Sequence, residues 1–155
     1  MTTKVTDLST IDTVKGADEG FDVQIYNPKT REDMGMIIHV IGEDSDEYKK
    51  GVYNQARKQQ ARMSKGGFRS VNWLPSPEET DQNALNLLVL ATKGWRTLAI
   101  KNDEGNIVEP EKNTIFAFGK ELEFTQENVL RVYGIPAVRD QVAIAVTDRA
   151  NFIKG

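Results

Sequence analysis

The densest apolar stretch of the chain, Ala84–Trp95, predicts its central helix. Asn86 is the only clearly polar side chain among the first eight residues, so the apolar surface is wider than an ordinary amphipathic stripe. Ser76 and Pro77 are typical of a helix start, because serine caps the first amides and proline fits the first turn. Gly94 is predicted to end the helix, since glycine readily adopts the left-handed conformation. Such a helix must be covered on several sides, and we expect the rest of the chain to cover it.

Two segments before this helix predict a β-hairpin. Phe21–Tyr26 alternates apolar and polar side chains, which is typical of a half-buried strand, and Met34–Ile41 supplies the second strand. Asn27 and Pro28 favour a turn between them, because proline fixes its own φ and asparagine bonds back to its backbone. Residues 1–20 are polar without a sustained period, so they are predicted to form a loose arm that orders against a neighbour.

Weaker patterns predict the other elements. Glu47–Ser64 is predicted to be a helix with a thin apolar stripe, and Leu98–Ile100 a short strand followed by a polar, turn-rich insert. Phe116–Phe124 alternates across a glycine turn, which favours a second tight hairpin or a single strand. Thr125 caps a short helix, and Pro136 opens the last one.

These elements predict an α+β fold: an N-terminal β-hairpin, then a small helical domain of about four helices with a short second β element. At 155 residues the chain has the length of one domain. The expected divisions are a flexible arm at 1–20 and a single domain at 21–153, made of a hairpin (21–42), two helices (43–95), a β and turn insert (96–124) and two helices (125–153).

Charge is distributed unevenly. The net charge is −3, but residues 48–77 carry seven basic side chains and no acidic one, which leaves −10 on the other residues. The basic stretch is a solvated helix face, a docking surface for an acidic protein partner, or a nucleic-acid site; the pI of about 5.3 makes nucleic acid unlikely. Its candidate partner-binding residues are Tyr53, Arg57, Lys58, Arg62, Phe68 and Trp73.

Residue types give little support to catalysis or metal binding. The absence of cysteine excludes disulfides and thiolate metal sites. His39 is the only histidine and lies in a predicted strand, so a strand-surface role is favoured over catalysis. No apolar run approaches the roughly 20 residues of a membrane span, and the start of the sequence lacks a signal-peptide core. We therefore expect a cytoplasmic protein that is not an enzyme, with no cofactor, metal or membrane association.

The C-terminal third carries an ordered set of short motifs. Gly-Trp closes Ala91–Trp95, and G-K-E-L-E-F-T-Q-E-N-V follows at Gly119–Val129. A proline turn at Ile135–Pro136 precedes the final D-R-A-N-F at Asp148–Phe152. In this order the motifs resemble small tail assembly chaperones of long-tailed, siphovirus-like bacteriophages. With the N-terminal hairpin and basic helix, the resemblance spans roughly residues 20–153.

The resemblance implies a viral protein that acts in the host cell cytoplasm during virion assembly. It implies binding to the long, helical tape measure protein, which the chaperone keeps soluble while the tail-tube protein polymerises around it. It implies no catalytic activity, and a homo-oligomer is possible. An apolar groove with a charged rim would recognise such a helix, and the basic helix Glu47–Ser64 is the predicted rim.

Two other functions stay open. A small structural or tail-completion protein retained in the phage tail would pack residues 1–20 and the insert 101–114 on neighbouring subunits. This insert is longer than in the family that the chain resembles. A nucleic-acid-binding regulator would instead lose affinity at high salt and on charge reversal at Arg57, Lys58 and Arg62.

Overall fold

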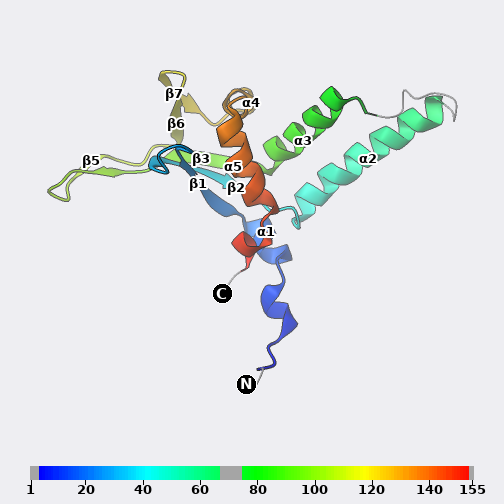
Figure 1. The fold of residues 1–155 in the computed structure, drawn as a ribbon, viewed down its shortest axis with the longest axis horizontal. Coiled ribbons are helices and arrows are strands. Elements are labelled where there is room, and N and C mark those ends of the chain that lie inside the picture. Colours follow the sequence, from blue (N-terminus) through cyan, green and yellow to red (C-terminus); the bar gives the residue numbers. More distant parts are fainter. Residues whose placement is uncertain (1–3, 67–74, 154–155) are drawn as a thin grey trace.

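The computed structural model describes residues 4–66 and 75–153 (Figure 1). An antiparallel sheet has the strand order β1–β2–β3, formed by Phe21–Tyr26, Asp33–Val40 and Thr92–Thr97. Two separate ribbons are β4–β5 (Ile100–Lys101 and Ile107–Glu109) and β6–β7 (Thr114–Ala117 and Lys120–Glu123). The α-helices are α1 (Val14–Glu19), α2 (Asp46–Gly66), α3 (Pro77–Ala91), α4 (Gln126–Tyr133) and α5 (Pro136–Thr147), with 3-10 turns at Leu8–Ile11 and Arg149–Phe152.

The mixed α+β class and the N-terminal hairpin are confirmed, but the helix count differs. Five α-helices lie within the described residues, against a prediction of about four, and the additional one is α1. This helix falls inside the segment predicted as a loose arm. Ala17 of α1 is fully buried, and its carbonyl accepts a hydrogen bond from the Gly42 amide at 3.0 Å. The chain therefore joins the folded domain before residue 20.

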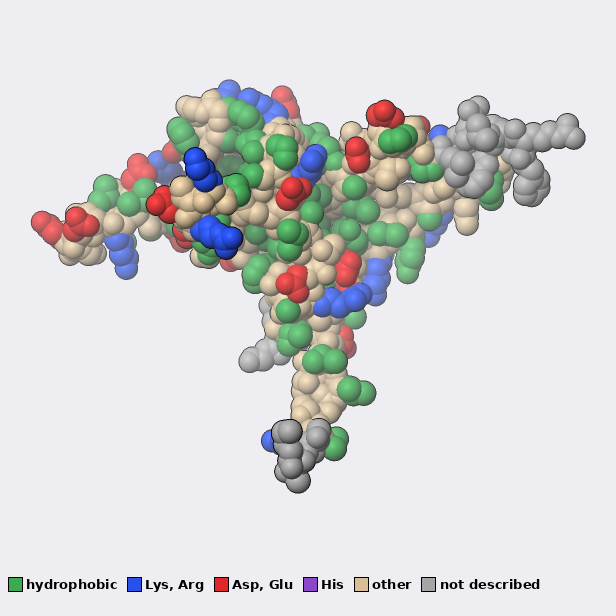
Figure 2. All heavy atoms as spheres, in the orientation of Figure 1, with side chains coloured by type: hydrophobic (Ala, Val, Ile, Leu, Met, Phe, Trp, Pro, Cys, Tyr) green, Lys and Arg blue, Asp and Glu red, His purple; other side chains and the backbone are tan. Residues whose placement is uncertain are grey.

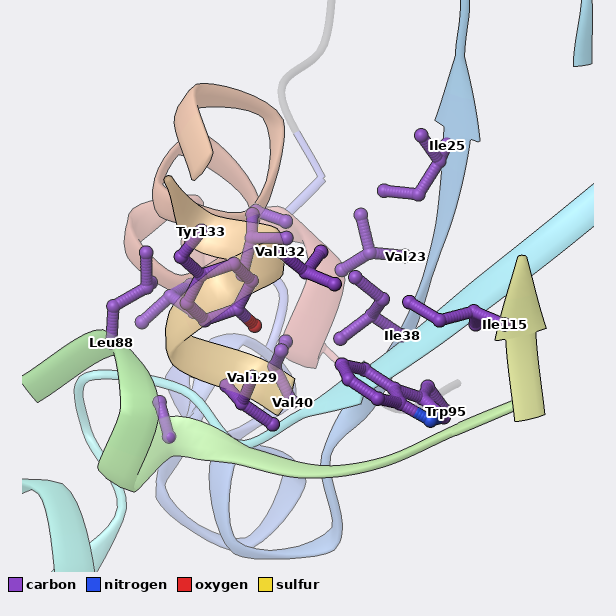
Figure 3. Close-up of a cluster of buried hydrophobic side chains, with 14 of the residues drawn as sticks. Val23, Ile25, Ile38, Val40, Leu88, Trp95, Ile115, Val129, Val132 and Tyr133 are labelled. Carbon is purple, nitrogen blue, oxygen red and sulfur yellow. The ribbon is translucent and has the colours of Figure 1, made fainter. Parts of the chain in front are cut away.

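One face of the sheet carries the core. Ile38 in the middle strand pairs with Val23 on β1 and Trp95 on β3, so the three side chains point to the same side. Helix α4 covers them with Val132 and the fully buried Tyr133, as Figure 3 shows. Burying branched aliphatic and aromatic side chains between a sheet and a helix layer is the main stabilising contribution to such a fold.

The central helix ends earlier than its sequence predicts. Helix α3 stops at Ala91, and Gly94 and Trp95 lie in β3, so the prediction that Gly94 ends the helix is wrong. Thr92 has extended backbone, and its hydroxyl donates to the Leu88 carbonyl at 2.8 Å. The buried Tyr133 hydroxyl lies against the same threonine oxygen. The following residues then pair with β2, and that ladder outweighs the helical period of the sequence.

The insert after β3 is folded as two ribbons. The β6–β7 ribbon confirms the predicted second hairpin, with Ile115 opposite Leu122. The strand expected at Leu98–Ile100 begins instead at Ile100, and it pairs with Ile107–Glu109 to form the β4–β5 ribbon. Figure 1 shows the β4–β5 ribbon extending away from the three-stranded sheet.

Both chain ends are tied together by Asp44, which follows β2. The Arg149 guanidinium donates to its carboxylate through Nε at 2.8 Å and Nη2 at 3.0 Å, and the Thr13 hydroxyl donates to the same group. The hydrogen bonds from Arg149, and then that from Thr13, lower the pKa of Asp44 from 3.8 to about 2. A charged Asp44 therefore links the segment before α1 to the segment after α5.

We expect Asp44→Asn to lower the free energy of unfolding at pH 7 by about 1–2 kcal/mol, because charge-assisted bonds are lost but Arg149 is partly screened by water. The folded-state pKa lies below the unfolded value, so the stabilisation is complete above 3.8 and is lost as the pH falls through about 2. Urea unfolding at pH 7 and pH 2 checks this. An equal difference between variant and wild type at both pH values would contradict it; Asp103→Asn, on the exposed β4–β5 ribbon, is the control.

Candidate protein-binding site between helices α2 and α3

Helices α2 and α3 leave the sheet as a two-helix arm (Figure 1). Gly51 permits their close approach at the base, since a Cβ there would lie 3.1 Å from Leu87 and from Leu90. Further out, the Gln55 side-chain amide donates to the Asn83 carbonyl at 2.8 Å. These contacts hold the helices together mainly through small and polar residues, so the arm has little apolar packing of its own.

A groove of about 600 Å³ runs between the two helices. Its apolar lining comes from Val52 and Ala56 of α2 and from Leu87 and Leu90 of α3. The other lining side chains are mostly amides, which can both donate and accept hydrogen bonds. Lys58 adds a positive charge to the lining. The groove thus combines apolar side chains with hydrogen-bonding groups, the two cations Lys58 and Arg62, and the carboxylate of Glu79.

The apolar surface of helix α3 is only partly covered. Only Leu88 and Ala91 of this helix are fully buried, although it is the most apolar segment of the chain. Two more grooves flank it: Leu87 also borders one of about 420 Å³ beside α5, and Leu90 borders one of about 470 Å³ beside α4. Helices α2, α4 and α5 and strand β3 all contact α3, so the expectation that the chain covers this helix on several sides is confirmed. The cover is incomplete, because Leu85, Leu87, Val89 and Leu90 are only half-buried and the helix borders grooves.

The predicted partner-binding residues do not share one surface. One side of α2 faces α3 and carries Gly51, Gln55 and Arg62. Gln55 donates a hydrogen bond to α3, and Arg62 Nη1 lies 2.5 Å from Glu79 Oε2. At 100° per residue, Tyr53 and Arg57 lie on the opposite side of α2. Lys58 and Arg62 line the groove, whereas Phe68 and Trp73 lie outside the described residues. Charge reversal at Arg57, Lys58 and Arg62 would thus alter two different faces.

Sequence reasoning did not find a second apolar cavity, of about 300 Å³, at the end of the sheet. Met36 of β2, Phe116 of β6 and Val138 of α5 contribute to its lining, together with Phe118 in the turn of the β6–β7 ribbon. The Arg131 guanidinium lies 4.9 Å from the centroid of the Phe118 ring. These residues come from distant parts of the chain, so no local pattern signals the cavity. The alternation of Phe116 and Phe118 predicted only the β6–β7 hairpin.

His39 lies on the sheet face opposite the core. Its Nδ1 is 2.7 Å from the Asp22 carboxylate and its Nε2 is 3.2 Å from the Glu19 carbonyl at the end of α1. Arg96 Nη2 also donates to Asp22, at 3.1 Å. Burial opposes ionisation of Asp22, but its hydrogen bonds with His39 and then Arg96 outweigh burial and lower the pKa of this carboxyl. The predicted strand-surface position of His39 is confirmed, and the side chain fastens α1 to the sheet.

Across residues 4–66 and 75–153, no three His, Asp or Glu side chains gather closely enough to hold a metal ion. In the same part of the chain, none of the helices has both the length and the apolar character of a membrane span. A scan against protein-family models and searches of curated proteins and of solved structures found no match.

Proposed function

We propose that this protein is a bacteriophage tail assembly chaperone, which binds a helical segment of the tape measure protein in the groove between α2 and α3. The observation that carries this proposal is the half-covered apolar surface of α3. A helix with five leucine and valine residues between positions 85 and 90 keeps only Leu88 fully buried. Grooves of this kind, lined by apolar side chains and rimmed by polar ones, are used by many proteins to hold an amphipathic helix.

The lining of the groove favours a particular partner helix. Leu87 and Leu90 would accept its apolar side, and the amides around them would bond polar side chains on its flanks. Lys58 would favour acidic residues beside the apolar stripe. Covering the apolar stripe of a long helical protein would keep that protein soluble until the tail-tube protein replaces the chaperone. The phage assignment itself rests on the resemblance of the motifs from Ala91 to Phe152.

The first experiment is co-expression with the tape measure protein of the same phage, followed by purification of the soluble complex. Calorimetric titration of the chaperone with a helical segment of that partner then measures the affinity. We expect a soluble complex with the wild type. Val52→Asp/Lys58→Glu should weaken it at least tenfold, since both side chains line the groove and a buried carboxylate is costly. Lys29→Glu, in the exposed β1–β2 turn, is the matched control. A partner that stays insoluble and unbound would overturn the proposal, and unaltered binding by the double variant would place the contact elsewhere.

A second candidate is a structural protein that stays in the tail. The observation in its favour is the N-terminal segment, where Val5, Leu8 and Ile11 are largely exposed. Leu8 and Ile11, three residues apart, lie on one side of the 3-10 turn at Leu8–Ile11, and Val5 precedes that turn. These exposed apolar side chains would suit a neighbouring subunit. Mass spectrometry of purified virions separates the two functions, because a chaperone leaves before the particle is complete and a structural protein remains.

A further inference from the structure

The β4–β5 ribbon has no cover from its own chain. Every residue of its two strands is exposed, including Ile100 at 51%, Ile107 at 62% and Val108 at 61%. An isolated two-stranded ribbon is marginally stable in water, and branched aliphatic side chains are costly to leave in solvent. The ribbon is nevertheless anchored at its base, where Thr97 and Lys112 exchange backbone hydrogen bonds at 2.9 and 3.2 Å. Such a surface is suited to packing against another molecule.

The end of this ribbon is acidic and well defined. Asp103, Glu104 and Glu109 outnumber the single cation Lys101 between residues 100 and 109. Figure 2 shows acidic side chains gathered at the outer end of the ribbon. The Asn102 side chain accepts hydrogen bonds from the amides of residues 104 and 106, at 3.1 and 2.9 Å, which fixes the turn. The ribbon therefore presents negative charge next to its exposed aliphatic side chains.

A surface of complementary charge lies on the outer face of α2, where Lys50 and Arg57 flank the ring of Tyr53. These residues stand at i, i+3 and i+7, so they form one stripe on the side of α2 that faces away from α3. Tyr53 is 56% exposed and provides an uncovered ring between the two cations. Helix α2 has 21 residues and is about 31 Å long, ample for a ribbon of about 17 Å.

These two complementary surfaces lie at opposite ends of the molecule. Figure 1, with the longest axis horizontal, shows the ribbon projecting from one end and α2 from the other. They cannot meet within one chain. We propose that the β4–β5 ribbon of one copy packs on the outer face of α2 of a second copy, with Ile107 or Val108 against Tyr53 and the acidic end beside Lys50 and Arg57.

This contact joins two different surfaces, so it is a head-to-tail interface. Each copy keeps one unused ribbon and one unused α2 face after the first contact, and association continues until a ring closes or a filament grows. The groove between α2 and α3 lies on the other side of α2, so the contact leaves it open. The proposal thus goes beyond the binding of a helical partner and does not depend on it.

Charge reversal tests the contact, with sedimentation velocity of the purified full-length protein as the readout. We expect the wild type to self-associate at protein concentrations between about 1 and 100 µM. The oligomers should dissociate as the salt concentration is raised, because the pairing is partly electrostatic. Asp103→Lys/Glu104→Lys and Lys50→Glu/Arg57→Glu should each weaken association at least tenfold. Their combination in one chain should restore it, since opposite charges face each other again. Lys29→Glu is the control for a reversal elsewhere.

Mixing two one-sided variants tests the head-to-tail geometry. Ile107→Asn/Val108→Asn removes the ribbon surface and keeps α2, whereas Tyr53→Ser/Arg57→Ser removes the α2 surface and keeps the ribbon. Each variant alone should be monomeric, and their mixture should form a heterodimer that grows no further. All seven side chains changed in these experiments are exposed, so folding is expected to persist and is checked by circular dichroism. A monomeric wild type at 100 µM, association unaltered by both charge reversals, or a symmetric dimer would overturn the proposal.

Discussion

Trp95→Ala is expected to lower the free energy of unfolding by about 3–5 kcal/mol, the usual cost of deleting a large buried aromatic side chain. Trp95 is almost fully buried on β3, opposite Ile38 of the middle strand. Its indole N–H donates to the Leu122 carbonyl at 3.2 Å, and its ring meets the Phe124 ring edge-on, with centroids 5.3 Å apart. One side chain therefore fills the core and also attaches the β6–β7 ribbon to the sheet.

Urea unfolding followed by circular dichroism measures this effect. Trp95→Phe is the matched control, because it keeps an aromatic ring in the core and loses mainly the indole bulk and the bond to Leu122. It should cost clearly less than the alanine variant, about 1–2 kcal/mol. A loss below about 1 kcal/mol for Trp95→Ala would mean that the ribbon and the sheet are not joined through this side chain.

Gly16→Ala is expected to destabilise the protein by about 3 kcal/mol, at the upper end of the range for overpacking. A Cβ at Gly16 would lie 1.8 Å from the Phe152 carbonyl oxygen, and backbone cannot rotate away as a side-chain tip can. Phe152 is almost fully buried and meets the Phe21 ring edge-on, so displacing it also disturbs the first strand. The variant must shift either α1 or the C-terminal turn.

Thermal unfolding should show this as a decrease in Tm of roughly 6–12 °C for a domain of this size. Hydrogen exchange should accelerate first in α1 and at Arg149–Phe152, which pack against each other. Gly94→Ala is the matched control, because a Cβ there meets nothing within 4 Å and its φ is not in the left-handed region. A variant at position 16 as stable as wild type would show that α1 is not held against the C-terminal turn.

Features determined by neighbouring residues could be predicted from the sequence. The side chain of Ser76 caps α3 by accepting from the Glu79 amide, and Thr125 caps α4 by accepting from the Asn128 amide. The hairpin follows from alternating side chains and the turn chemistry of Asn27, whose side chain accepts from the Lys29 amide at 2.9 Å. Each of these interactions joins residues a few positions apart, so composition and spacing were enough.

The spacing of basic residues along α2 does not predict which of them line the candidate site. Arg57 and Arg62 belong to the same basic helix and are equivalent by composition, yet Arg62 pairs with Glu79 of α3 while Arg57 lies on the outer face. Nor does the spacing of the basic residues in α2 predict which side α3 occupies. In the structure α3 lies against Gly51, where the missing side chain leaves room for Leu87 and Leu90.

The sequence by itself determined the α+β class, the N-terminal hairpin, the starts of α3, α4 and α5 and the uneven charge, because each depends on interactions over a few residues. Only the tertiary structure decided that α3 ends at Ala91, since the next residues gain a β2 partner more than fifty positions earlier in the chain. It also decided that α1 packs on the C-terminal turn and that the apolar surface of α3 is only half covered. Those outcomes depend on which distant segments pack against each other, and the local sequence of either segment does not predict the other.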